Sequence, residues 1–96
     1  MPAYIIFTRT KTLDKTELET YWSTIQDTMK GHPIEVLVSY GEFEVLEGEQ
    51  IEGVVVAKFP DMGSAKKWYY SESSRKAMMH RQMGAIYNGI LVEGIS

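Results

Sequence analysis

The stretch GVVVAKF at residues 53–59 predicts a β-strand with apolar side chains on both of its faces. The stretch AYIIFT at residues 3–8 has the same character, since β-branched and aromatic residues follow one another there. Strands of this kind lie in the middle of a sheet, where both faces are covered. We therefore expect these two segments to be the central strands of one sheet.

Two further strands are predicted, at residues 34–40 and 86–93. After the first of them Gly41 interrupts the pattern, and the stretch EFEVLEG at residues 42–48 resumes it with alternating glutamates. A glycine inside a strand pattern indicates a bulge or a sharp bend. We expect Gly48 to form the turn of a hairpin. A polar connection is expected to follow the first strand, over residues 9–13.

A long helix is predicted over residues 15–30. Asp14 precedes it as the N-cap, and Glu17 has the spacing to return a bond to the Asp14 amide, as in a capping box. Leu13 and Leu18 occupy the positions of a hydrophobic staple around this start. Apolar residues then recur at helical spacing on one face, namely Leu18, Tyr21, Trp22, Ile25 and Met29.

Two shorter helices are predicted in the second half of the chain. Asp61 is the expected N-cap of the first, whose apolar residues are Met62, Ala65, Trp68 and Tyr69. Serines at positions 71, 73 and 74 break the pattern and offer several caps. The last helix is expected over residues 74–83, and Gly84 ends it.

The predicted element order is βαββαβ with a split second helix. Right-handed crossovers then place all helices on one face of a four-stranded antiparallel sheet, which makes this an α+β fold. With 96 residues the chain is expected to form a single domain over residues 1–96. Because no further element can cover the other apolar face of the central strands, we expect a homodimer with its sheets packed face to face.

Charge and composition exclude several classes of protein. The net charge of −3 argues against a nucleic-acid partner, and no apolar run is long enough to cross a membrane. The start of the chain lacks a signal-peptide pattern, so a cytoplasmic location is expected. Without cysteine there is no disulfide, thiol nucleophile or thiolate metal site. Residues 1–49 are net acidic and residues 50–96 net basic, which could attract an anionic ligand to the second half.

His80 and Arg81 are the first candidates for chemistry. A histidine transfers protons near neutral pH, and an arginine binds a carboxylate with its planar fork. Together they could bind an organic acid and move one of its protons. The alternative is a solvated basic helix end, where positive charge suits the helix dipole. His32 lies in a loop far from His80, so neither a bound metal nor a cofactor is expected.

Aromatic side chains and one glutamate are the remaining candidates. Trp68, Tyr69 and the tyrosine after them cannot all face inward on one helix, so one of them could line a cleft, although core packing is the ordinary role of Trp68. Tyr21 has the same two possible roles on the long helix. Tyr4 could orient a ligand oxygen or pair across strands. Glu47, beside a glycine, could act as a base or be a solvated turn residue.

The chain resembles the small bacterial family known as domain of unknown function thirteen-thirty, within the dimeric α+β barrel superfamily. The resemblance rests on Arg81 and on segments spread over the whole chain: AYIIF at 3–7, the Leu18–Tyr21–Trp22 helix face, EVLEGE at 44–49, VVVAKFPD at 54–61, AKKWYYS at 65–71 and ILVEG at 90–94. It implies a ferredoxin-like fold, a dimer, and a cleft between sheet and helices. The chain departs from the family pattern at Glu72 and Ser74, and at Pro33.

Three functions are compatible with this sequence. The first is a binding protein for a small acidic or aromatic ligand, with Arg81, Trp68, Tyr69, Tyr21, Tyr4 and Glu47 as candidate ligand contacts. The second rests on analogy with barrel relatives: a cofactor-free enzyme, such as a monooxygenase, isomerase or decarboxylase, that uses His80 and Arg81. The third is a structural or stress-related dimer. Heme would need His80 or His32 as its axial ligand and is not expected.

Overall fold

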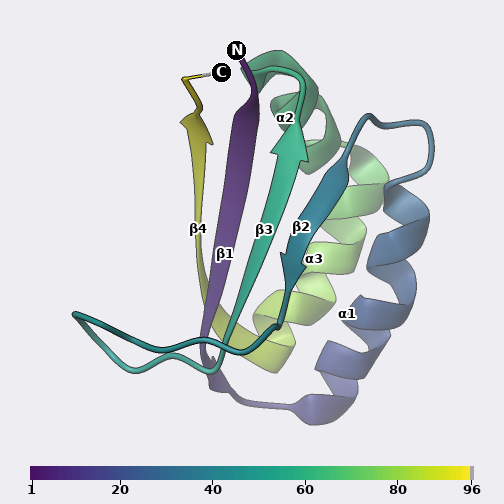
Figure 1. Cartoon of the computed structure of the whole chain (residues 1–96). Helices are drawn as coiled ribbons and strands as arrows, with labels where there is room; N and C mark the ends of the chain where they lie inside the picture. Colours follow the sequence, from purple (N-terminus) through teal and green to yellow (C-terminus); the bar gives the residue numbers. More distant parts are fainter. Residues whose placement is uncertain (96) are drawn as a thin grey trace.

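The computed structural model describes residues 1–95 and shows a sheet with helices on one face (Figure 1). The two predicted central strands, β1 (Ala3–Thr12) and β3 (Gly53–Phe59), lie side by side in the middle of a four-stranded antiparallel sheet. The strand β2 (Glu35–Ser39) flanks β3, and β4 (Ala85–Glu93) flanks β1, so the order is β2-β3-β1-β4. The βαββαβ prediction is therefore confirmed.

Side chains alternate between the two faces of this sheet. In β1, Ala3, Ile5 and Phe7 are buried beneath the helices, and they pair across to alternate residues of β3 such as Ala57. The core on this side is closed by Trp68, whose indole Nε1 donates to the Thr28 hydroxyl at 3.2 Å.

Three helices cover the face that these side chains share. They are α1 (Lys15–Thr28), α2 (Met62–Tyr69) and α3 (Glu72–Gly84). The last begins two residues earlier than predicted, because Ser71 caps it and accepts the Ser74 amide at 3.3 Å. None of the helices formed by residues 1–95 is both long and apolar enough to cross a bilayer.

The start of α1 is joined to the end of α3. Asp14 caps α1 as predicted and accepts the amides of Thr16 and Glu17 at 3.0 and 3.4 Å. The returning half of the predicted capping box is wrong, because the Asp14 amide donates to the Gly84 carbonyl at 2.9 Å. The Glu17 carboxylate lies 2.7 Å from His80 Nδ1 instead. Leu13, the predicted staple residue, is 56% exposed.

Two predictions about strands are wrong. Residues 9–12 continue β1 rather than connect elements, because β4 pairs with them as far as Thr12. Residues 42–48 form neither a strand nor a hairpin, and the chain from 40 to 52 is a long loop that projects from one end of the sheet (Figure 1). The partner strand β3 begins only at Gly53, so a hairpin there would stand alone, and an isolated two-stranded ribbon is marginally stable.

The face of the sheet opposite the helices is apolar and uncovered. Besides the polar residues Thr8, Lys58 and Asn88, the side chains that share it by strand register are Tyr4 and Ile6 of β1, Val54 and Val56 of β3, and Ile90 and Val92 of β4. Ile90 is 60% exposed, although it lies beside Ile6 near the centre of this surface. We call these six residues the open sheet face.

Candidate functional site

The Arg81 side chain points from the last turn of α3 into the interior, and the residue is only 6% exposed. Its guanidinium carbon lies 4.4 Å from the centre of the Phe7 ring and 4.8 Å from that of Tyr87. The Tyr21 ring follows at 5.7 Å. Arginine binds well against aromatic rings. The rings of Phe7 from β1, Tyr21 from α1 and Tyr87 from β4 therefore form an aromatic cage around the Arg81 cation.

This buried cation has no counter-charge among residues 1–95. The Nε and Nη1 atoms of Arg81 are buried without a hydrogen-bond partner. Moving an unpaired charge out of water costs several kcal/mol, so a buried guanidinium ordinarily has a carboxylate beside it. The aromatic cage compensates only part of this cost, since a cation–π contact contributes about 0.5 to 2 kcal/mol.

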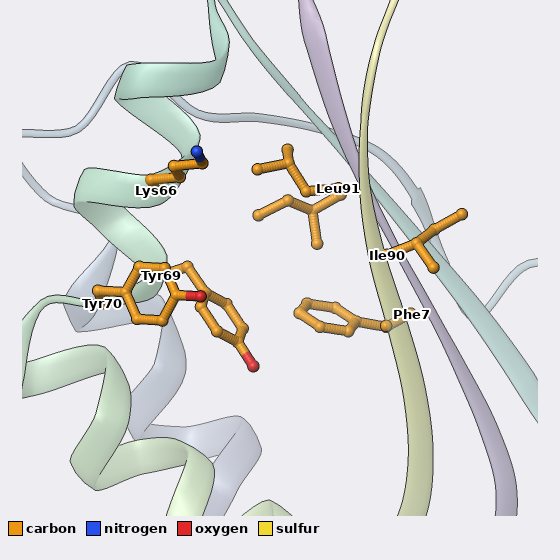
Figure 2. A pocket seen from close by; sticks show the side chains of 8 residues that line it. Phe7, Lys66, Tyr69, Tyr70, Ile90 and Leu91 are labelled. Carbon is orange, nitrogen blue, oxygen red and sulfur yellow. The ribbon is translucent and has the colours of Figure 1, made fainter.

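A cavity of about 320 Å³ borders the Arg81 side chain. It lies between β4 and α3, and its wall consists of Phe7, Tyr69, Arg81, Gln82, Ala85, Ile86, Tyr87 and Gly89. A smaller cavity of about 220 Å³ adjoins it along β4 and is lined by Ile5, Phe7, Lys66, Tyr69, Tyr70, Gly89, Ile90 and Leu91. Figure 2 shows Tyr69 and Lys66 of α2 facing Phe7 and Leu91 across the smaller cavity, whereas Ile90 points away from it.

Gly89 keeps the space between β4 and the helices open. A Cβ atom at this position would lie 2.8 Å from Cδ1 and Cε1 of the Phe7 ring, which is closer than real Cβ contacts allow. Any side chain at position 89 would therefore displace the Phe7 ring, which packs against the Arg81 guanidinium.

The largest of these three cavities, of about 710 Å³, lies between α1 and strands β2 and β3. Its lining is mostly apolar and includes Trp22, Ile25, Met29, Val36, Val55 and Trp68. Arg9 lies at one end, with its guanidinium 5.7 Å from the Trp22 ring and 5.1 Å from the Tyr40 ring. Unlike Arg81, Arg9 has a counter-charge, because its Nε lies 3.2 Å from the Glu52 carboxylate.

A pair of phenols links the Arg81 cage to this largest cavity. The Tyr40 and Tyr87 hydroxyls are 2.5 Å apart, and Trp22 Nε1 donates to Tyr40 at 3.3 Å. Burial, and then the hydrogen bond with Tyr40, raise the pKa of Tyr87. Burial also raises the pKa of Tyr21, against the opposing effect of the Arg81 charge. The Tyr21 and Tyr87 phenols therefore remain protonated at neutral pH and serve as hydrogen-bond donors rather than bases.

The structure brings three of the predicted site residues together. Arg81, Tyr21 and Tyr69 are grouped around the cage and its adjoining cavity. Trp68 lies in the core, 2% exposed, and one side of it borders the largest cavity.

Three other predicted site residues lie elsewhere. His80 faces α1 and contacts Glu17, so the adjacent Arg81 and His80 point to different parts of the molecule. Tyr4 is on the open sheet face. Glu47 is exposed in the loop from 40 to 52. Within residues 1–95, no three histidine or acidic side chains gather in a way that could coordinate a metal ion.

Sequence reasoning missed Phe7, Lys66 and Arg9 as site residues. The sequence pattern indicates Phe7 only as part of an apolar strand, although period-two alternation places it on the helix side. The same alternation continues to Arg9, but only if the strand extends past Thr8, as it does. Lys66 precedes Trp68 by two positions on α2, and nothing in the helical pattern alone distinguishes it from Lys67.

This sheet order, with helices on one face and cavities between the two layers, defines a ferredoxin-like α+β protein. The comparison with protein families goes further. The chain belongs to the family described as Domain of unknown function (DUF1330), whose model matches residues 2–95. No curated protein shows significant similarity to the chain.

Solved structures of distant relatives share this fold. A protein of unknown function from Rhodopseudomonas palustris has a TM-score of 0.77 at 17% identity, over 99% of this chain and 83% of that one. SnoaB, a cofactor-independent oxygenase from Streptomyces nogalater, has a TM-score of 0.67 at 9% identity, over 99% and 94%. A dimeric ferredoxin-like protein of unknown function from Bacteroides fragilis has a TM-score of 0.65 at 12% identity, over 97% and 96%.

Proposed function

We propose that this protein binds a small organic acid whose carboxylate pairs with Arg81. The observation that carries the proposal is the Arg81 guanidinium, which has no counter-charge among residues 1–95 and belongs to a residue that borders a cavity. A carboxylate accepts two parallel hydrogen bonds from such a planar fork, and these charge-assisted bonds are among the strongest in proteins. The apolar or aromatic body of the ligand lies against Phe7 and Tyr69, which border the same space.

The charges around the cavity support an anionic ligand. No aspartate or glutamate lines either cavity beside β4, although the whole chain has a net charge of −3. A ligand carboxylate therefore meets Arg81 without a competing protein carboxylate, and the desolvation cost of the guanidinium favours its entry.

Calorimetric titration with phenylacetate and hexanoate tests this function, with the neutral amides of the same acids as ligand controls. The acids are expected to bind and the amides to bind at least about 10-fold more weakly, since hydrogen bonds to charged groups contribute roughly 1.5 to 3 kcal/mol. Arg81→Met is expected to abolish the difference, and Arg75→Met, on the exposed side of the same helix, to preserve it. Equal affinity for acid and amide in the unmodified protein would refute the proposal.

We also propose that two copies of the chain pack their open sheet faces together. An apolar surface of this kind in contact with water favours association, and an identical surface gives a closed, symmetric pair. The dimeric description of the Bacteroides fragilis protein, which has the same fold, supports this arrangement.

Replacing Ile6 with glutamate tests the dimer. Ile6 pairs with Val56 on one side and Ile90 on the other, so a glutamate there would place two buried like charges in the interface. Sedimentation analysis is expected to show a dimer for the unmodified protein and a monomer for Ile6→Glu. Met79→Glu introduces the same charge at an exposed methionine on α3 and is expected to leave the dimer intact. A monomeric unmodified protein would contradict this proposal.

Catalysis by His80 and Arg81 acting on one ligand has no support in this geometry, because His80 contacts Glu17 on the α1 side. We therefore restrict the proposed function to binding. The likeness to SnoaB concerns the fold alone at 9% identity.

A further inference from the structure

The cavity beside Arg81 has a neighbour along β4. It shares Phe7, Tyr69 and Gly89 with the smaller cavity along β4, so the two spaces meet at these three residues. The two cavities, of about 320 and 220 Å³, thus lie next to each other between β4 on one side and helices α2 and α3 on the other, and we call them together the groove. Arg81 borders only the first part and Lys66 only the second.

The second part of the groove has a cation of its own. Figure 2 shows Lys66 on α2, on the helix side of the smaller cavity, with Leu91 on the strand side. Within residues 1–95 Lys66 forms no ion pair, whereas Lys30 and Lys76 each pair with an acidic neighbour on the surface. The adjacent Lys67 is exposed and does not border the groove.

The space between the two cations is apolar. Phe7 and Tyr69 lie in the middle, with Ile5 and Leu91 toward the Lys66 end. An apolar middle with one cation toward each end is complementary to a molecule with the inverse pattern, an apolar body between two anions.

We propose that the groove binds an elongated dicarboxylic acid, with one carboxylate at Arg81, the other near Lys66, and the apolar chain over Phe7 and Tyr69. This inference rests on the proposed function, since it assumes that Arg81 binds the first carboxylate. The two ends are not equivalent. Arg81 is buried and provides the main anchor, whereas Lys66 is exposed, so its pairing is weak and sensitive to salt.

The test compares hexanedioic and octanedioic acids with hexanoic and octanoic acids in calorimetric titrations at low salt. One of the diacids is expected to bind about 3-fold to 5-fold more tightly than the monoacid of equal length, as for an exposed ion pair. Raising the ionic strength is expected to remove this advantage. Lys66→Met is expected to remove it as well, and Lys67→Met, the neighbouring lysine outside the groove, to leave it unchanged.

The outcomes separate this inference from the proposed function. Diacids that bind no more tightly than monoacids, or an advantage that Lys67→Met reduces as much as Lys66→Met does, would overturn the dicarboxylate inference alone. Monoacid binding that Arg81→Met leaves intact would overturn the proposed function, and the inference with it. Two results together support the proposed function and the dicarboxylate inference. Arg81→Met loses the binding of monoacids and diacids alike, and Lys66→Met loses only the advantage of the diacids.

Discussion

Replacing Arg81 with methionine is expected to raise the free energy of unfolding of the ligand-free protein by about 1 to 2 kcal/mol. The change removes a buried guanidinium that has two unpartnered nitrogens and keeps a side chain of similar length against Phe7 and Tyr87. The lost cation–π contacts offset part of the gain. Urea denaturation followed by circular dichroism measures the effect, with the slope expected to stay the same.

The control for this prediction is Arg75→Met, which changes the same residue type on the exposed side of α3 and is expected to alter stability by less than about 0.5 kcal/mol. Adding hexanoate is expected to stabilise the unmodified protein and Arg75→Met but not Arg81→Met, because a ligand that binds the native state raises its stability. Marked destabilisation by Arg81→Met would mean that the arginine stabilises the core rather than serving as a ligand anchor.

Replacing Gly84 with alanine is expected to destabilise the protein by about 1 to 3 kcal/mol, the usual cost of overpacking. A Cβ atom there would lie 2.9 Å from the Leu18 amide nitrogen and 3.0 Å from the Asp14 carbonyl oxygen. Both are backbone atoms of the α1 start, so the two helices must separate. The shift would also strain the bonds from the Leu13 and Asp14 amides to the Gly84 carbonyl, at 2.8 and 2.9 Å.

Gly63→Ala is the matched control for this second prediction. Gly63 is also a helical glycine, but a Cβ atom there would meet only the Asp61 carboxylate at an ordinary 3.5 Å. Alanine favours helix over glycine, so thermal denaturation is expected to show this variant unchanged or more stable by up to about 1 kcal/mol. Equal destabilisation by both substitutions would show that the contact between α1 and α3 at Gly84 is not the cause.

The sheet could be predicted because its signals are local. Residues 53–59 and 3–8 are apolar on both faces, and only central strands fit that composition. Helix starts at Asp14 and Asp61 were equally predictable, since an N-cap side chain bonds to amides two or three residues away. Prediction failed where the bonding partner lies far along the chain. The Asp14 amide bonds to the Gly84 carbonyl, and the Glu17 carboxylate contacts His80, whereas a capping box would have joined that amide and that carboxylate to each other.

The candidate site was only partly predictable for the same reason. The family resemblance indicated Arg81, but its cage brings residues from β1, α1 and β4 together over long sequence separations. No local pattern shows that Tyr87 contacts Tyr40, or that His80 turns away from its neighbour. The glutamates at 42–48 suggested a strand by alternation alone, while the absence of a partner strand could be seen only in three dimensions.

Hydrogen bonds to the sheet hold the two ends of the loop from 40 to 52, and the residues between these ends are mostly exposed. At one end the Tyr40 amide donates to Val54 at 2.8 Å; at the other the Glu52 amide donates to Arg9 at 2.6 Å and its carboxylate accepts from the Thr12 hydroxyl at 2.6 Å. Almost every residue between these anchors is exposed. Lengthening a loop closed in this way costs little chain entropy, which makes the segment around Gly48 a natural insertion point for a peptide tag or a reporter group.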